Sequence, residues 1–159
     1  MRVLGTQLTA AQREAGLRAI EEHALAWGIG AVPAAEIDAL GIVPATRKAM
    51  ALALRSLPIP ADYLLIDHLQ LTELQLPQYS LPKGDVHVLS IAAASIVAKV
   101  SRDRMMYDLE TQVPSYGFAQ HKGYGTPQHR SALEALGPSL VHRLSFAPVR
   151  ALGAVQDGR

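Results

Sequence analysis

Two aspartates frame the stretch of this sequence that most constrains its fold. Residues 63–66 form a short apolar run, rich in Leu and Ile, which predicts a buried strand, and Asp67 follows at its end. Asp85 comes just before residues 88–112, whose first half is apolar almost all round and predicts a long helix. The sequence therefore puts one carboxylate at the end of a strand and another at the start of a helix.

Two interpretations of this pair of carboxylates are open at this point. Asp67 and Asp85 could be brought together to hold a hard divalent cation such as Mg²⁺ or Mn²⁺, which prefers oxygen ligands. Alternatively, Asp67 ends a strand and Asp85 caps a helix, because aspartate is favoured in turns and at helix N-caps. The spacing of the two residues alone favours the second interpretation.

The composition predicts a folded domain and excludes several kinds of site. The chain has 159 residues, of which 49% are hydrophobic, and its formal net charge is +1. These values predict one globular domain with an apolar core and give no overall sign of a nucleic-acid partner. There is no cysteine, which excludes disulfides and thiolate metal sites. No apolar run has the length of a signal peptide core or a membrane span, so we expect no membrane contact and a cytoplasmic protein.

The remaining elements are predicted from helical spacing and capping residues. The Thr9 to Gln12 string has the form of a capping box, and the segment after it predicts a helix over 10–24. The glycine-rich segment 27–32 is a candidate strand. Further helices are expected over 34–40, 45–57, 88–112 and 126–136, with Pro44, Pro114, Thr126, Gly41 and Gly137 marking their starts or ends.

The segment from 115 to 130 has a different composition. It is rich in Gly, Pro, Tyr and His, which predicts a loop built for contact rather than for the core. His121 and His129 in this segment could suggest a zinc pair, but no third ligand with suitable spacing accompanies them. The sequence does not decide whether the last part, residues 142–150, packs on the domain.

Five separate blocks of the sequence together resemble the ribonuclease HII family. They are LIDH (65–68), KGD (83–85), SIAAASIVAKVSRDRMM (90–106), YGFAQHKGYGTPQH (116–129) and HRLSFAPVR (142–150). The resemblance runs from about Leu8 to Arg150 and keeps the order of the blocks. It implies an α/β ribonuclease H-like fold whose first strands are missing here and whose remainder is rich in helices. It also implies a partial family domain over 1–150, followed by a tail over 151–159.

The resemblance implies a hydrolase that acts on nucleic acid. Enzymes of the family cut the RNA strand of RNA-DNA hybrids and nick duplex DNA at embedded ribonucleotides, using four acidic residues that hold Mn²⁺ or Mg²⁺. Asp67 takes the place of the third acid and Asp85 that of the fourth, so both are candidate catalytic residues and metal ligands. Tyr124 matches the tyrosine that the family places against the sugar. Lys122 and Lys99 are candidate phosphate contacts.

The family's opening motif, Asp-Glu-Ala-Gly-Arg-Gly, does not occur in this sequence, and Asp and Glu are nowhere adjacent. Without the first two acids, Asp67 and Asp85 would hold a divalent ion weakly, so we expect this chain to be inactive or impaired. The strand at 63–66 should then lack a neighbour, and its exposed edge could allow a non-native oligomer. His68 stands where the family usually has glycine, so the backbone conformation beside Asp67 could differ from that of the family.

A non-catalytic module is the alternative function. Such a module would keep the tyrosine loop and the basic residues and would bind nucleic acid or a protein partner without cutting. A preference for RNA-DNA hybrid over duplex DNA at two salt concentrations would distinguish it from a protein with no nucleic-acid affinity.

Overall fold

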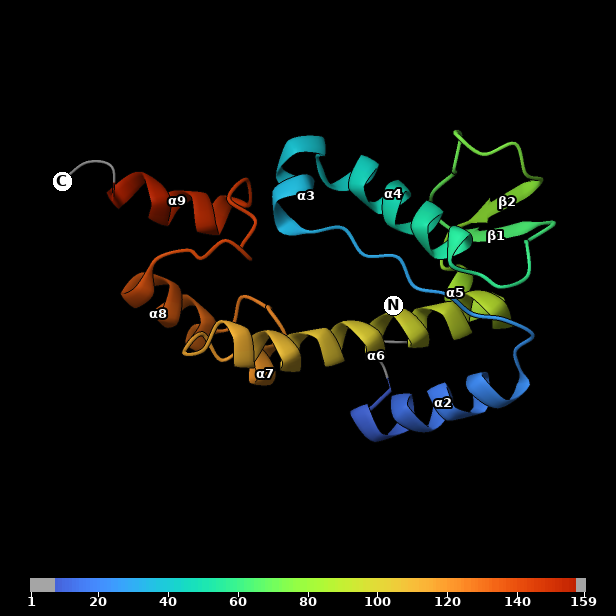
Figure 1. Ribbon diagram of the computed structural model, residues 1–159, viewed down its shortest axis with the longest axis horizontal. Helices are drawn as coiled ribbons and strands as arrows, with labels where there is room; N and C mark the ends of the chain where they lie inside the picture. The colour runs from blue at the N-terminus through green and yellow to red at the C-terminus, as the bar shows by residue number, and fades with distance from the viewer. Residues whose placement is uncertain (1–7, 157–159) are drawn as a thin grey trace. The chain divides into compact units, whose positions relative to one another are not determined.

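The computed structural model describes residues 8–156, which fall into two compact units. The first unit comprises residues 8–31 and 47–101, and the second comprises residues 32–46 and 102–156. Each unit has an apolar cluster of its own, and α4 and α6 contribute to both units (Figure 1). The elements are α2 (Ala10–His23), α3 (Ala34–Leu40), α4 (Ile42–Arg55), β1 (Leu64–Asp67), β2 (Gln78–Leu81), α5 (Gly84–His87), α6 (Leu89–Gln112), α7 (Phe118–His121), α8 (Pro127–Leu136) and α9 (Ala147–Gln156).

Helix α2 begins at the predicted capping box. Thr9 Oγ1 accepts a hydrogen bond from the Gln12 N–H (3.2 Å), and Gln12 Oε1 accepts one from the Thr9 N–H (2.8 Å). These bonds satisfy donors that have no partner within the helix. Leu17 on the buried face of α2 is only 2% exposed and packs against Val97 and Val100 of α6. The prediction of this helix is confirmed.

Strands β1 and β2 lie side by side and run parallel, with Leu64 opposite Gln78 and Asp67 opposite Leu81 (Figure 1). Burial alternates along β1, because Leu64 and Ile66 are buried whereas Leu65 is 43% exposed. The expected strand is therefore present one residue later than predicted, and only one of its faces is buried.

Strand β2 corrects the expectation that the strand before Asp67 would lack a neighbour. The sequence pattern predicted no element over residues 78–81, but they pair with β1 along its whole length. In the described part of the chain the sheet has these two strands. The fold is nevertheless of the predicted class, a helix-rich α/β arrangement with a small sheet.

The candidate strand at 27–32 is wrong, since the structure has no strand there. Gly28 and Gly30 pass so close to α4 that a side chain would not fit. A Cβ at position 28 would lie 2.6 Å from Ala53 O, and one at position 30 would lie 1.9 Å from Ala49 O. These glycines serve close packing of an irregular segment on a helix, which is a recognised use of residues without a Cβ.

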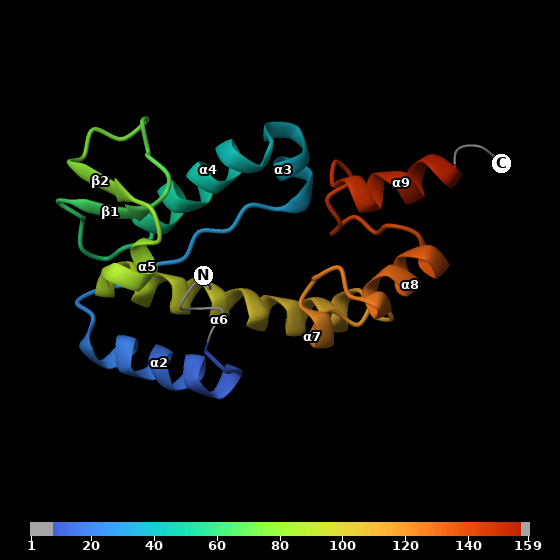
Figure 2. The same ribbon diagram turned by 180° about the vertical axis from the view of Figure 1, so that it is seen from behind.

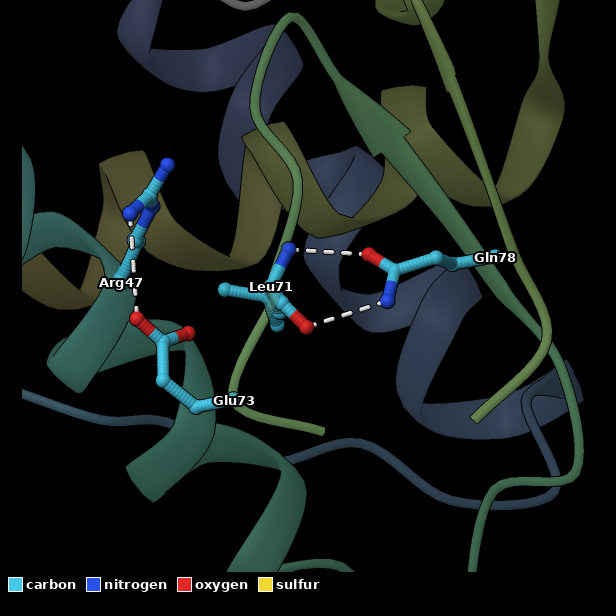
Figure 3. A network of polar contacts seen from close by, with 4 residues as sticks. All are labelled: Arg47, Leu71, Glu73 and Gln78. Atoms are coloured by element: carbon cyan, nitrogen blue, oxygen red, sulfur yellow. Dashed lines mark hydrogen bonds and ion pairs between the residues drawn. The ribbon is translucent and has the colours of Figure 1, made fainter. Parts of the chain in front are cut away.

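The loop between the two strands is held by side-chain hydrogen bonds (Figure 3). Gln78 Oε1 accepts from the Leu71 N–H (2.8 Å), and Gln78 Nε2 donates to the Leu71 carbonyl (3.0 Å). Arg47 of α4 also forms an ion pair with Glu73 of the loop (3.7 Å). Leu71 is 2% exposed, which makes its side chain one of the most buried among the described residues. The two bonds to Gln78 satisfy both the backbone N–H and the backbone carbonyl of Leu71.

The second unit has its core where the sequence predicted a contact loop. Tyr116, Phe118, Leu133 and Val149 are buried together. The loop prediction for this segment was therefore wrong in part, because the segment contains helix α7 and supplies two of the core side chains. The burial of Val149 also shows that the last predicted block packs on this unit, and α9 continues from it to Gln156.

Helix α3 and the segment before α9, both in the second unit, are connected through Asp38. Its carboxylate accepts hydrogen bonds from the Leu144 N–H (2.7 Å), the Ser145 N–H (3.1 Å) and the Ser145 hydroxyl (2.5 Å). The bond from the Ser145 hydroxyl is the main cause that lowers the pKa of Asp38 below its usual value of 3.8. Helix α8 has Thr126 as its N-cap and Gly137 as its C-cap, as predicted.

Across residues 8–156, none of the helices combines the length and the apolar character that crossing a membrane would require.

The clamp between Gln78 and Leu71 yields a prediction about stability. Gln78→Ala should lower the free energy of unfolding by about 2 kcal/mol, because it leaves a buried backbone donor and acceptor of Leu71 without partners. Urea denaturation measures this change. Gln75→Ala, at an exposed position in the same loop, is the control and should change stability little. Equal effects of the two substitutions would show that the clamp does not stabilise the loop.

Candidate metal-binding carboxylates and tyrosine loop

The structure places the segment that carries Asp85 beside Asp67 at the end of β1. Asp67 is the last residue of β1, and its Oδ1 atom accepts a hydrogen bond from the Gly84 N–H (3.0 Å). Asp85 is the next residue after this donor, in helix α5, which lies beside β1 in both views (Figures 1 and 2). One backbone amide thus fixes the carboxylate of Asp67 next to the residue that carries the second carboxylate.

The Lys-Gly-Asp string has a local geometry that explains each of its residues. Lys83 has a φ of 59°, in the left-handed region, and turns the chain from β2 into α5. Gly84 is buried, and a Cβ there would lie 2.5 Å from Ile91 Cδ1. Any larger residue would have to push Ile91 aside or move α5 away from Asp67. Gly84 is therefore needed for the short distance across which its N–H reaches the carboxylate.

Asp85 is 2% exposed, which is unusual for an acidic residue. It interacts with its surroundings, but its Oδ1 atom is buried and accepts no hydrogen bond within the described residues. One of the two interpretations had Asp85 as the cap of the long helix. The structure differs, because α6 begins four residues later, at Leu89. Asp85 lies in the first turn of the separate short helix α5.

His68 follows Asp67 with a φ of 66°, in the left-handed region that favours glycine. Its N–H nevertheless donates to the Leu81 carbonyl (3.2 Å) and so extends the pairing of β1 with β2. The structure thus explains why glycine suits this position and shows that histidine occupies it with the strand pairing intact. The backbone beside Asp67 is kept at the cost of a strained residue.

The donor set fits a hard divalent cation in part. Carboxylate oxygens are the ligands that Mg²⁺ and Mn²⁺ prefer. Within residues 8–156, however, no group of three or more His, Cys, Asp or Glu side chains could hold a metal ion. Asp67 and Asp85 therefore provide two ligands, and a complete coordination sphere requires further oxygen atoms.

Tyr124 lies on the surface of the second unit and is 53% exposed. The guanidinium of Arg102 lies 5.0 Å from the centre of its ring, a distance typical of a cation–π contact. Lys122 Nζ lies 3.3 Å from the centre of the Tyr107 ring and donates to the Ala119 carbonyl. Two basic groups and two tyrosine rings are thus grouped around this loop.

The five candidate residues are divided between the two units. Asp67, Asp85 and Lys99 belong to the first unit, where Lys99 is half-buried on α6. Lys122 and Tyr124 belong to the second unit. In the first unit Asp67 bonds to the residue before Asp85, and in the second unit Lys122 and Tyr124 lie two positions apart in one loop.

Three buried histidines next to this loop were not predicted as a cluster. His121, His129 and His142 are 6%, 6% and 8% exposed, and their rings contact Phe118. The zinc interpretation of the first two fails on geometry, because both ring nitrogens of His121 bond to the backbone, at the Tyr116 carbonyl and the Gly123 N–H. Helical spacing was the missed signal: His129 precedes the core residue Leu133 by one turn of α8.

Burial lowers the pKa of both His129 and His142 below the usual value of 6.5, because a charged ring would lose its contact with water. For His142 the neighbouring His129 has the next largest effect in the same direction. For His129 the hydrogen bond to the Tyr124 carbonyl acts in the opposite direction. Both rings are therefore neutral near pH 7.

With this geometry in view, comparison with known proteins identifies the type of fold. The structure is similar to the crystal structure of the ribonuclease H2 from Pyrococcus horikoshii OT3, with a TM-score of 0.80 and 20% sequence identity. The match covers 98% of this chain and 81% of that one. The class is therefore an α/β protein with a ribonuclease H-like fold.

The family follows from the sequence comparisons. The family model of Ribonuclease HII matches residues 6–149. The chain is 55% identical to a Ribonuclease HII from Chloroflexus aggregans over 95% of its length, 56% identical to one from Roseiflexus castenholzii over 89%, and 51% identical to one from Geobacillus thermodenitrificans over 95%. The chain belongs to the ribonuclease HII family. It spans 71%, 63% and 58% of the lengths of these three relatives.

Membership confirms the resemblance on which the sequence analysis rested. The family is one of type 2 ribonucleases H, hydrolases that act on RNA in RNA-DNA hybrids, and nothing in the comparisons favours the non-catalytic alternative.

The strain at His68 predicts a stabilising substitution. His68→Gly should raise the free energy of unfolding by about 0.5–1 kcal/mol, because glycine adopts a positive φ without a steric penalty. The control is Gln70→Gly, at an exposed position without a positive φ, where glycine should lower stability by about 0.5–1 kcal/mol. Urea denaturation compares the two. A loss of stability in His68→Gly would mean that the histidine is held there by contacts that outweigh the strain.

The buried histidines predict a dependence of stability on pH. Above about pH 6.5, the ordinary pKa of histidine, the folded and unfolded chains both carry neutral rings and stability is complete. As the pH falls below that value, the unfolded chain takes up protons that folded His129 and His142 resist, so the free energy of unfolding should fall. The double variant His129→Asn/His142→Asn should show a shallower loss between pH 7 and 5. An identical slope in both proteins would contradict the buried neutral state.

Proposed function

We propose that Asp67 and Asp85 of this chain hold divalent metal ions in a nuclease that hydrolyses the RNA strand of RNA-DNA hybrids. The observation that supports the proposal is the hydrogen bond from the Gly84 N–H to Asp67 Oδ1, which holds the Asp67 carboxylate at the residue before Asp85 in a chain of the ribonuclease HII family. Both residues are then catalytic. Duplex DNA with an embedded ribonucleotide is a substrate of the same kind, since both present a 2′-hydroxyl at the cut.

Divalent metal ions held by Asp67 and Asp85 would supply Lewis-acid chemistry for the hydrolysis of a phosphodiester. The part of this chain is to hold its carboxylates in position. Gly84 engages one lone pair of Asp67 Oδ1 and leaves the remaining oxygen sites of that carboxylate for other partners. Asp85 would contribute a carboxylate that is 2% exposed.

Both Mg²⁺ and Mn²⁺ suit these oxygen ligands, and both are proposed as the metal. Two carboxylates leave most coordination positions to other oxygen atoms, from water, from substrate phosphates and from further acids. The sequence printed here contains no Asp-Glu-Ala-Gly-Arg-Gly string to provide further acids. We therefore propose that the 159 residues alone cleave weakly or not at all.

Contacts to the substrate are assigned to residues of both units. The exposed ring of Tyr124 suits stacking against a nucleotide sugar or base, and it already has the guanidinium of Arg102 at 5.0 Å. Lys122 and Lys99 are proposed to contact phosphates, which would position the duplex without reading its sequence. The proposed location is the cytoplasm, and the proposed extent of the family domain is residues 1–150, with 151–159 as a tail.

A chimera tests the proposed roles. The segment with the Asp-Glu-Ala-Gly-Arg-Gly motif of a family member would be joined in front of this chain, and cleavage of a labelled RNA-DNA hybrid would be measured with Mn²⁺ and with Mg²⁺. The chimera should cleave, and the 159-residue chain should cleave far less. Asp67→Asn and Asp85→Asn should each lower the rate of the chimera by about 100-fold or more, because each removes a metal ligand.

Asp62→Asn is the matched control for these variants, since Asp62 is exposed and lies just before β1. It should leave the rate unchanged. Cleavage that persists in both Asp67→Asn and Asp85→Asn would place the metal site elsewhere. Equal rates for the chimera and for the chain alone would show that this chain needs no further acids.

A further inference from the structure

A continuous path of hydrogen bonds in the second unit runs through two buried histidine rings to the backbone of Tyr124. The Ser139 N–H donates to His142 Nδ1 (3.0 Å), and the Ser139 hydroxyl lies 2.8 Å from the same nitrogen. His142 Nε2 lies 3.2 Å from His129 Nε2, and His129 Nδ1 lies 3.0 Å from the Tyr124 carbonyl oxygen. The path thus begins at one backbone amide and ends at one backbone carbonyl.

The two ends of the path determine where the protons are. A backbone N–H can only donate, so His142 Nδ1 is an acceptor and the proton of this neutral ring is on Nε2. The Tyr124 carbonyl can only accept, so His129 carries its proton on Nδ1 and accepts at Nε2. The contact between the two Nε2 atoms is then an ordinary hydrogen bond in which His142 donates. No other assignment of one proton to each ring satisfies all the contacts.

The surroundings of the two rings favour the neutral state. The His121 ring stacks on the His129 ring with centres 4.2 Å apart and an angle of 11° between planes, and charges on both rings at this distance would repel. His142 lies against Tyr116 and Phe118. His121 itself donates to the Tyr116 carbonyl (2.7 Å) and accepts from the Gly123 N–H (3.1 Å).

We propose that His129 and His142 are positioning residues that fix Tyr124 through this relay of two neutral rings with defined tautomers. The Tyr124 carbonyl accepts from both His129 Nδ1 and the Thr126 N–H (2.8 Å), and the Tyr124 N–H donates to the His121 carbonyl (2.9 Å). The backbone of an exposed tyrosine is therefore held at three points by the interior of the unit. A role of this fixed backbone in the reaction rests on the substrate contact proposed for Tyr124. The relay itself can be tested without substrate.

The first measurement is of the tautomers, by long-range ¹⁵N–¹H correlation spectra of the 159-residue chain at pH 7.5. The relay predicts a proton on Nδ1 for His129 and on Nε2 for His142, with both rings neutral. A charged ring at either position, or His129 with its proton on Nε2, would overturn the proposal. This result does not depend on nucleic acid.

The second measurement separates positioning from simple filling of the core. His129→Asn keeps an N–H near the place of Nδ1, whereas His129→Gln reaches the place of Nε2 and has no donor at Nδ1. Amide hydrogen exchange at Tyr124 and Thr126 should be about fivefold faster in His129→Gln than in His129→Asn, as expected for one lost hydrogen bond. Equal exchange in the two variants would overturn the positioning role. His87→Asn, at an exposed histidine, is the control.

The third measurement connects the relay to the substrate. Fluorescence anisotropy with a labelled RNA-DNA hybrid should give an affinity for His129→Gln about fivefold weaker than for His129→Asn, and a loss at least as large for Tyr124→Ala. If Tyr124→Ala leaves the affinity unchanged while the tautomers and exchange rates are as expected, the proposed sugar contact is wrong and the relay stands. If Tyr124→Ala weakens binding but the two His129 variants bind equally, the relay has no part in recognition.

Discussion

The hydrogen bond from the Gly84 N–H to Asp67 Oδ1 is the interaction on which the candidate site depends. It joins the end of β1 to the start of α5, and so it converts two acidic residues eighteen positions apart into neighbours. The bond is possible because Gly84 has no side chain to collide with Ile91 and because Lys83 turns the chain in a left-handed conformation. Strand pairing, the strained His68 and the clamp on Leu71 all keep the end of β1 where this amide can reach it.

In both units a polar side chain bonds to backbone that lies outside its own helix or strand. Gln78 does this for the loop after β1, Asp38 for the segment before α9, and His129 for Tyr124. Each such bond fixes main chain that has no regular partner, at little cost in conformational freedom because the side chain is itself packed. The sheet has two short strands in the described part of the chain, and these side-chain bonds satisfy backbone groups that lie outside it.

Helical spacing and capping were enough to predict α2, α3 and α8 and the long helix after Asp85, because these features depend on neighbours in the sequence. Strand β2 was missed because four residues between two prolines carry no clear period, and only pairing with β1 makes them a strand. The contact between Asp67 and Gly84 and the cluster of His121, His129 and His142 depend on tertiary packing, which spacing does not report. The family resemblance identified the two aspartates as a pair, but the amide that joins them was visible only in three dimensions.

The most direct test of the paired carboxylates is paramagnetic broadening by Mn²⁺ in amide spectra of the chain. At low Mn²⁺ the signals of Asp67, Gly84 and Asp85 should be lost first and together, and Asp85→Asn should abolish this selective loss, because broadening falls steeply with distance from the ion. Loss of signals first at exposed acidic residues elsewhere, or the same pattern in the Asp85→Asn protein, would contradict the account and show that the two aspartates do not share a metal.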